Sequence, residues 1–454
     1  MAESGVTVGL DIGTSSVKAV AVDDDGVVVA RARVPHEVAM PTLTRMHHDA
    51  LVAWHDDVLA AYASVSAGLD VAAVQVAAMV PSLCAVDEAG RPISPGLLYG
   101  DDRGWRDGGA PGANPSESGE FLGFVEWSAA HAPRAAGFWP AQAVANHALC
   151  GVGAVDSVTA MTTLPLFDFT GWDEQVAASV GVTPERLPMI VAGHQVAGTT
   201  ADGALVGGGT IDAFAEQLVA GADHTGDVLV ILGSTLIVWA VVDEWIEIPG
   251  LWTVPHTVPG KVLVGGPSNA GGIFTGVVDR LIAGVGGGPS GSGPWRGLDP
   301  ADLPVWLPYV RGERVPLHDP TRRASLHGLG VHHSPSAVRH AAFESAGFVV
   351  REILDLAGIS ATRIVGTGGG THSAEWVQSL ADGAALPVDV AAVAEGGAYG
   401  AAWLARGVAG FPEAGGSPHP WARTARRVDP DPAWVDGATE RYEQFRELTG
   451  PIAG

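Results

Sequence analysis

A strand, a turn of small residues and a second strand occur together twice in this 454-residue chain, and this repeat limits the fold more than any other feature. The first copy spans residues 6–22 and the second spans residues 228–242, and both are rich in β-branched side chains. Repetition of one supersecondary unit predicts a duplicated architecture. We therefore expect two domains, residues 1–226 and residues 227–454, within a size range that suits two cores better than one.

The first copy continues in a way that defines the fold class. A turn at residues 23–26 leads into a third strand at 27–34, which predicts an antiparallel meander. Helical spacing of apolar residues follows at 49–63, and residues 71–78 are typical of the next strand. Helices and strands then alternate, which predicts an α/β protein.

In the second half, Ser334 and Pro335 are typical of a helix start, and apolar residues keep helical spacing up to Gly358. The segment 284–293 is almost entirely Gly, Ser and Pro, and it is predicted to form a surface loop.

The charge of the chain excludes several classes of partner. Its formal net charge of -25 repels nucleic acid backbones and anionic lipid surfaces, so neither is expected to bind. The longest apolar run, residues 228–242, is shorter than the ~20 residues that span a bilayer. We expect no membrane partner and no nucleic acid partner, and we leave a homodimer open.

Cysteine content indicates the compartment. Cys84 and Cys150 are the only cysteines, too few for a disulfide scaffold or a cysteine-based zinc site. The N-terminus begins with a strand-like pattern and lacks the features of a signal peptide. A cytoplasmic protein is expected. The pair His47 and His48 has no matching ligands at zinc spacing, and we interpret it as a solvated helix start.

Phosphate binding by a P-loop is excluded because Lys261 is followed by Val262, and Lys18 is the only other lysine. The first turn offers another route. Gly13 permits a tight turn in which the amides and hydroxyls of Thr14 and Ser15 converge on phosphate oxygens. Asp11, at the end of the preceding strand, is suited to hold hydrated Mg²⁺. An ordinary hairpin with a strand-end aspartate explains this pattern equally well.

Two further segments strengthen the nucleotide interpretation. Gly233, Ser234 and Thr235 form a second small-residue turn, predicted to hold the same phosphates from the opposite lobe. The run Gly368, Gly369 and Gly370 follows a predicted strand and precedes a predicted helix, so backbone there can approach a planar ring. A repeated sheet edge and a plain glycine-rich loop are the structural alternatives.

Taken in order, these segments resemble the FGGY carbohydrate kinases over nearly the whole chain. The resemblance rests on residues 9–18, 207–221, 233–235, 308–323, 367–376 and 395–402. It implies two ribonuclease-H-like lobes of the actin and hexokinase ATPase fold, with MgATP and a small sugar or polyol meeting in the cleft. By the same resemblance Asp212 matches the catalytic base, Lys18 lies near the phosphates, and Gly368 to Gly370 line the adenine and ribose site. Helix capping is the structural alternative for Asp212.

The sequence departs from the family on the sugar side. Where xylulokinase-like members carry Gln-Met-His-Gly, this chain has Met79-Val80-Pro81-Ser82, and the histidine is absent. The Trp-Asn-Asp element is replaced by Tyr99-Gly100-Asp101. Met79, Tyr99, Asp101 and Arg103 are the sugar-side candidates; for Asp101 and Arg103 a surface loop cluster remains an equal alternative.

A xylulokinase-like ketose kinase that uses ATP and Mg²⁺ is the leading functional hypothesis, and a kinase for another ketose, a deoxy sugar or a short polyol is the second. Two other classes stay open. An actin-like ATPase module would hydrolyse ATP without regard to sugars, and a catalytically silent sugar-binding regulator would bind a sugar and release no ADP.

Overall fold

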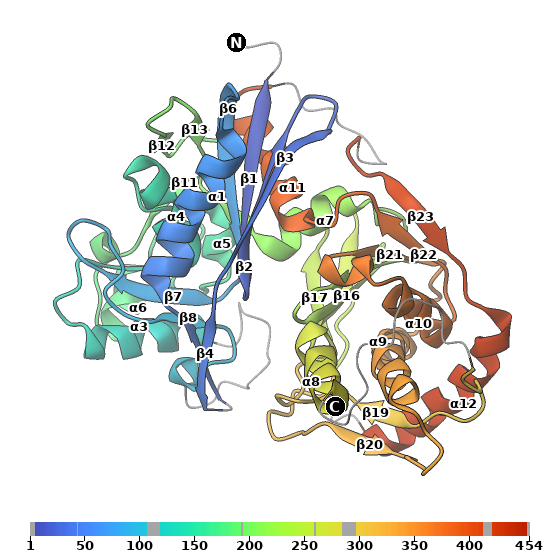
Figure 1. Ribbon diagram of the computed structural model, residues 1–454. Coiled ribbons are helices and arrows are strands. Elements are labelled where there is room, and N and C mark those ends of the chain that lie inside the picture. Colours follow the sequence, from blue (N-terminus) through green and yellow to red (C-terminus); the bar gives the residue numbers. More distant parts are fainter. Residues whose placement is uncertain are drawn as a thin grey trace. The chain divides into compact units, whose positions relative to one another are not determined.

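Each half of the protein is organised around a mixed β-sheet (Figure 1). The computed structural model describes residues 5–42, 44–106, 119–191, 194–257, 260–283, 297–411 and 420–451. The loop predicted at 284–293 lies outside the described residues. Contacts divide the chain into two units, Met1–Val219 with Glu395–Trp421 and Ala220–Ala394 with Ala422–Gly454.

The sheet of the first unit confirms the predicted meander. β1, β2 and β3 pair antiparallel in sequence order, and β6 joins the other edge of β1 in parallel. β13 and β14 both pair in parallel with β6, and β12 pairs with β13. The strands are β1 (Val6–Ile12), β2 (Ser16–Val22), β3 (Val28–Pro35), β6 (Val71–Ala78), β12 (Gly198–Thr199), β13 (Leu205–Val206) and β14 (Thr210–Ile211).

The sheet of the second unit repeats this order. β15, β16 and β18 form the antiparallel meander, and β21 pairs in parallel with β15 as β6 does with β1. β22 continues the parallel side, and β17 and β23 lie at the two edges. The strands are β15 (Asp227–Leu232), β16 (Leu236–Val242), β17 (Trp252–Pro255), β18 (Val262–Ser268), β21 (Arg363–Thr367), β22 (Val388–Ala391) and β23 (Thr424–Val428). The predicted α/β duplication is therefore confirmed.

Strand β1 is covered on both faces, because side chains alternate along it. Val8 and Leu10 belong to a core cluster that includes Val58 of α1 (Asp57–Ser66). Gly9 faces the other way, toward α11 (Gly396–Val408), where an added Cβ would lie 1.8 Å from the Ala398 carbonyl oxygen. The helix can approach β1 this closely only because residue 9 has no side chain.

That contact changes the division expected at residue 227. The segment Glu395–Trp421 groups with the first unit and not with the second, where the sequence places it. The reason is the packing of α11 on β1 and β6, an association between segments remote in sequence. The grouping also moves the first boundary from residue 226 to Val219.

The long helix of the second unit has the predicted ends. α9 (Pro335–Ala357) begins after Ser334, whose side chain accepts a hydrogen bond from the Ala337 amide. It ends at Gly358, which has the left-handed φ of 63° that favours glycine. α10 (Ala374–Ala384) packs against α9, and both contribute to the larger core of this unit.

One local prediction is wrong. His47 and His48 lie in β5 (Arg45–His48), and the helical segment begins only with the π-helix η1 (Leu51–Asp56). His48 is fully buried, so it is not a solvated helix start. β5 pairs with β8 (Gly96–Leu98), which takes these residues into a small second sheet.

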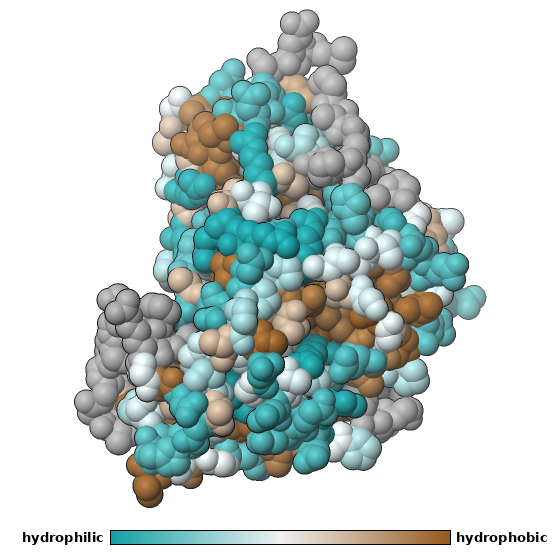
Figure 2. Space-filling model, turned by 90° about the vertical axis from the view of Figure 1, so that its right-hand side faces the viewer, coloured by the Kyte–Doolittle hydropathy of each residue, from teal (hydrophilic) through white to brown (hydrophobic). Residues whose placement is uncertain are grey.

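The surface is more polar than the chain as a whole, of which 47% is hydrophobic. The face drawn in Figure 2 is mainly hydrophilic and is interrupted by separate hydrophobic patches. Exposed apolar side chains include Phe169, Trp245 and Val331. Among the described residues, no helix combines the length and the apolar character that crossing a membrane requires.

Candidate active site

Three parallel strands of the first unit end side by side and bring its candidate residues together. Asp11 of β1 and Thr210 of β14 both lie opposite Ala77 of β6. The residues that follow, Gly13 and Asp212, therefore leave the sheet at the same edge and the same level. Ligands of open α/β sheets bind beyond the carboxyl ends of parallel strands, which makes this edge the candidate site.

A group of charged side chains occupies this edge. Asp11 is only 5% exposed, and its Oδ2 atom lies 3.2 Å from Lys18 Nζ on the neighbouring strand. The attraction of Asp11 raises the pKa of Lys18 above its usual value, with smaller contributions from Glu216 and Asp212. One ammonium group thus shares its surroundings with three carboxylates.

Glycines at the start of α11 let two of these carboxylates approach the helix. A Cβ added to Gly397 would lie 2.9 Å from Asp11 Cγ, and one added to Gly396 would lie 2.6 Å from Glu216 Cγ. The amino-terminal end of a helix carries partial positive charge, which stabilises nearby carboxylates. The absence of side chains at Gly396 and Gly397 therefore lets the carboxylates of the site lie close to the positive end of α11, in addition to allowing α11 to pack closely.

Asp212 is the first residue of α7 (Asp212–Ala220), directly after β14. Its Oδ1 atom accepts a hydrogen bond of 2.7 Å from the Ala213 amide, and the residue is half-buried. The carboxylate thus accepts a hydrogen bond from an amide in the first turn of α7, which is part of what the capping alternative predicts.

The first small-residue turn is tight, and its side chains lie beside a predicted sugar-side residue. The Gly13 amide donates to the Ser16 carbonyl at 3.1 Å. The hydroxyls of Thr14 and Tyr99 are hydrogen-bonded at 2.9 Å. Tyr99 is therefore placed against the turn, while Ser15 is exposed.

Asp101 and Arg103 form a buried ion pair. Both Asp101 oxygens accept from the Arg103 guanidinium at 2.7 Å, and they also accept from the Met46 and Arg103 amides. Asp101 is fully buried, so the alternative of a surface cluster is wrong for it. Arg103 stacks over the Trp127 ring at 5.1 Å. Both oxygens of the Asp101 carboxylate are therefore occupied, and their contacts hold Arg103 and the Met46 backbone in place.

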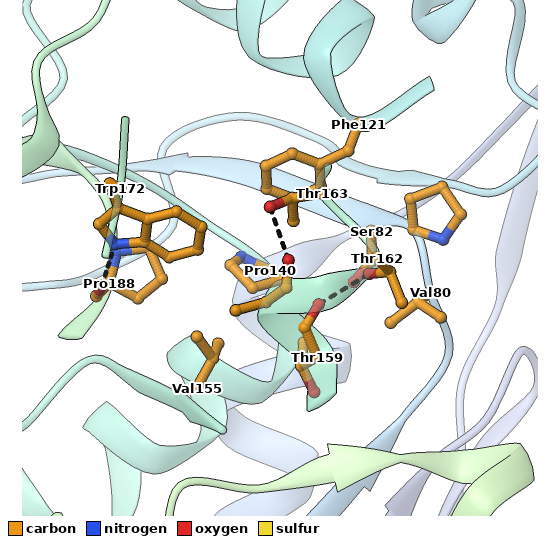
Figure 3. A pocket seen from close by; sticks show the side chains of 12 residues that line it. Val80, Ser82, Phe121, Pro140, Val155, Thr159, Thr162, Thr163, Trp172 and Pro188 are labelled. Atoms are coloured by element: carbon orange, nitrogen blue, oxygen red, sulfur yellow. Dashed lines mark hydrogen bonds between the residues drawn. The ribbon is translucent and has the colours of Figure 1, made fainter. Parts of the chain in front are cut away.

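Met79 lies in the core of the first unit and is 3% exposed, but the residues after it line a pocket. Figure 3 shows this small pocket, which is partly open to solvent. Its wall is mostly apolar, and it includes Val80, Pro81, Phe121, Pro140, Val155 and Trp172.

Three donors of the pocket wall are used within the wall. Thr162 Oγ1 donates to the Thr159 carbonyl at 2.8 Å, and Thr163 Oγ1 donates to the Ala160 carbonyl at 2.8 Å. Trp172 Nε1 donates to the Pro188 carbonyl at 2.7 Å (Figure 3). These three groups are occupied, and the rest of the wall is mostly apolar, which favours an apolar group.

The second unit brings its two predicted nucleotide segments together. The turn Gly233 to Thr235 follows β15, and Gly368 follows β21, the strand paired with β15. Gly368 packs on Leu232 with a φ of 87°, so that an added Cβ would lie 2.9 Å from the Leu232 carbonyl oxygen. Gly370 packs against Leu232 and the Trp376 ring, whereas Gly369 is exposed and has open space around it.

Helix α8 (Gly272–Ala283) begins on the second turn. The Gly272 amide donates to the Gly233 carbonyl at 2.9 Å, and the Ile273 amide donates to the Ser234 carbonyl at 3.0 Å. These bonds hold the turn against the helix. The expectation that the turns of the two units face each other across a cleft stays a prediction.

The carboxylates at this sheet edge are suitable ligands for a divalent cation. Magnesium is held by one or two carboxylates together with water and substrate phosphates. Asp11, Asp212 and Glu216 supply carboxylates around a single ammonium group. The cluster therefore has the negative charge that such a cation needs.

Glu216 was not found by the sequence reasoning. It lies four residues after Asp212, so both side chains project from the same face of α7. A carboxylate one turn after the candidate base was the signal that could have revealed it.

The order of strands in both units and the position of the carboxylates define the class: the protein has the actin and hexokinase ATPase fold. Comparison with models of protein families agrees with this fold and identifies a particular family. Residues 6–106 match the N-terminal domain, and residues 297–407 the C-terminal domain, of the FGGY family of carbohydrate kinases. The chain belongs to the FGGY family of carbohydrate kinases and is a sugar kinase.

Individual relatives cover most or nearly all of the chain. The chain is 29% identical to a xylulose kinase of Streptomyces rubiginosus, over 98% of this chain and 95% of that protein. It is 23% identical to a gluconokinase of Bacillus subtilis over 82% of each. The crystal structure of xylulose kinase from Rhodospirillum rubrum superposes with a TM-score of 0.73 at 25% identity, covering 98% of both chains.

Proposed function

We propose that the protein transfers the γ-phosphoryl group of ATP to a hydroxyl group of a small ketose, with xylulose as the leading candidate. The likeness to xylulose kinases over almost the entire chain supports this substrate class. The observation that carries the proposal is the meeting of Asp11, Lys18 and Asp212 at one sheet edge.

Asp212 is the proposed general base. Its carboxylate follows a strand end and accepts a hydrogen bond from the Ala213 amide, so it is held in place. Phosphoryl transfer depends mainly on positioning and charge neutralisation, so one carboxylate near the attacking hydroxyl suffices. Asp212 accepts the proton of that hydroxyl as the oxygen attacks the γ-phosphorus.

Asp11 is the proposed magnesium ligand, and Lys18 orients it. The strand end holds Asp11 buried, and Lys18 is restrained by the ion pair at 3.2 Å. When bound, Mg²⁺ neutralises charge on the transferred phosphoryl group. Lys18 supplies a further positive charge for the phosphates.

The nucleotide is proposed to bind through backbone groups. Gly13, Thr14 and Ser15 offer amides and hydroxyls to phosphate oxygens in the first unit. In the second unit Gly233, Ser234 and Thr235 bind phosphate, and Gly368 to Gly370 bind adenosine. Exposure and open space at Gly369 support a place for a planar ring there.

A second candidate substrate is a sugar with a deoxygenated end. The mostly apolar lining of the pocket beside Val80 and Pro81 favours this class.

Sugar-dependent release of ADP tests the proposal. Xylulose, its terminally deoxygenated analogue, gluconate and glycerol would be compared at equal concentrations with MgATP. A kinase releases ADP with at least one of them and forms a phosphorylated product. An actin-like ATPase would release ADP at a rate indifferent to sugars, and a silent regulator would bind a sugar without ADP release; either result would exclude the kinase.

A further inference from the structure

Two histidines lie directly beneath the first phosphate turn. His36 Nε2 is 3.0 Å from the Gly13 carbonyl oxygen, and His48 Nε2 is 2.8 Å from the Thr14 carbonyl oxygen. The two imidazole rings are in edge contact, with centroids 4.6 Å apart. Consecutive carbonyl groups of the turn are therefore each held by a ring nitrogen.

Holding these carbonyls also determines where the amides point. A trans peptide unit is planar, so its C=O and the following N–H point in opposite directions. When the Gly13 and Thr14 carbonyls face the histidines, the Thr14 and Ser15 amides face away from them. Among the described residues, neither amide donates a hydrogen bond within the protein. The Thr14 and Ser15 amides are therefore available as donors to a phosphate group.

Neighbouring side chains determine which nitrogen of His48 can donate. Trp54 Nε1 donates to His48 Nδ1 at 2.9 Å, so the proton of neutral His48 is on Nε2 and points to the Thr14 carbonyl. Asp57 Oδ2 lies 3.3 Å from His36 Nδ1 on the other ring. Burial lowers the pKa of His48 to about 4, which keeps it neutral at physiological pH.

We propose that His36 and His48 are positioning residues that aim the Thr14 and Ser15 amides at the phosphates of the nucleotide. The inference rests on the proposed function for the identity of the ligand. Neither histidine touches the nucleotide. Each acts through a carbonyl of the turn, and Trp54 acts through His48.

Substitution of His48 tests this arrangement. His48→Phe keeps an aromatic ring but loses the donor, and we expect KM for MgATP to rise roughly tenfold, while KM for the sugar stays within about twofold. His48→Gln can donate to the Thr14 carbonyl and accept from Trp54, so it should restore KM for MgATP to within about threefold. Trp54→Phe, a milder change, should give an intermediate KM.

The control is His55→Gln. His55 lies beside Trp54 in the π-helix η1, and its side chain pairs with Asp56 and not with the turn. Far-ultraviolet circular dichroism and thermal unfolding establish that each variant folds. An equal rise in KM for sugar and for MgATP, or a glutamine variant as defective as the phenylalanine variant, would overturn the proposal.

Titration with MgATP by calorimetry separates this inference from the proposed function. A wild-type protein that binds MgATP but phosphorylates no sugar removes the proposed function, and weaker binding by His48→Phe still supports the positioning role. Equal MgATP affinity of wild type and His48→Phe overturns the positioning role whatever the activity. A wild type that does not bind MgATP overturns both.

Discussion

Lys18 Nζ lies 3.2 Å from Asp11 Oδ2, so the ammonium group of one strand restrains the carboxylate of the next. Their register explains the contact, because Asp11 and Lys18 are opposite partners in the β1–β2 ladder. The pair places a positive and a negative charge close to the turn at Gly13, the proposed phosphate site.

Asp11→Ala should raise the Mg²⁺ requirement of the enzyme, and Lys18→Met should not. Loss of Asp11 removes a carboxylate ligand, so the Mg²⁺ concentration for half-maximal activity should rise at least about tenfold. Loss of Lys18 removes a competing cation, so that concentration should stay the same or fall, while KM for ATP rises. Titrating activity with Mg²⁺ at fixed ATP measures both. A normal metal response in Asp11→Ala would refute its placement.

Asp212→Asn should lower kcat by roughly 100- to 10,000-fold, the range typical of losing a general base. The amide oxygen can still accept the Ala213 amide, so α7 should begin normally and MgATP should bind with unchanged affinity. Steady-state kinetics and calorimetry measure the two effects. Glu216→Gln, one turn later on α7, is the matched control and should lose less activity. Unchanged turnover in Asp212→Asn would remove Asp212 from its proposed role.

Gly9→Ala should destabilise the first unit by at least about 3 kcal/mol, the upper end of the usual cost of overpacking. The added Cβ would lie 1.8 Å from the Ala398 carbonyl oxygen and 2.4 Å from the Ala402 amide nitrogen, and backbone cannot move aside as a side chain can. Gly171→Ala, where no atom lies within 4 Å, is the control and should be close to neutral. Urea denaturation measures both variants; equal stability would show that α11 can shift at little cost.

Arg441→Met should destabilise the second unit by about 3–5 kcal/mol at pH 7, because it leaves the buried Glu344 carboxylate without its partner. Arg441 Nε and Nη2 donate to the two Glu344 oxygens at 2.7 and 2.6 Å. Burial alone would raise the pKa of Glu344, but Arg441 and His340 lower it to about 2.

The sign of the pH effect follows from that pKa. The folded pKa is below the unfolded value of 4.5, so the stabilisation is present above pH 4.5 and is lost as pH falls toward 2. In Arg441→Met the carboxyl group prefers to be protonated, so its defect should shrink as pH falls from 7 to 5. Denaturation at the two pH values measures this; a defect that grows on acidification would contradict the assignment.

Local patterns account for the parts of the fold that the sequence predicts well. The meander of β1 to β3 and its repeat around Gly233 depend on short turns and adjacent strands. The ends of α9 follow from Ser334, Pro335 and Gly358, which act on neighbouring backbone groups. The family resemblance then orders these segments, and the family models confirm it.

Burial of polar groups was the part that could not be predicted. His48 reads as a solvated residue beside His47, yet Trp54 and the Thr14 carbonyl satisfy it in the core. Asp101 reads as a loop residue, yet its carboxylate is enclosed by Arg103 and the Met46 amide. In both cases one partner is remote in sequence, the Thr14 carbonyl for His48 and the Met46 amide for Asp101, and local spacing does not reveal it.

The contact between β1 and α11 has a consequence for biosynthesis. Thr7 Oγ1 donates to the Ala402 carbonyl at 2.9 Å, across 395 residues of chain. A growing polypeptide leaves the ribosome amino end first, so most of the second unit emerges before the first unit receives its last helix. One surface of the first sheet stays uncovered throughout that interval, and a fragment truncated before residue 395 would never cover it.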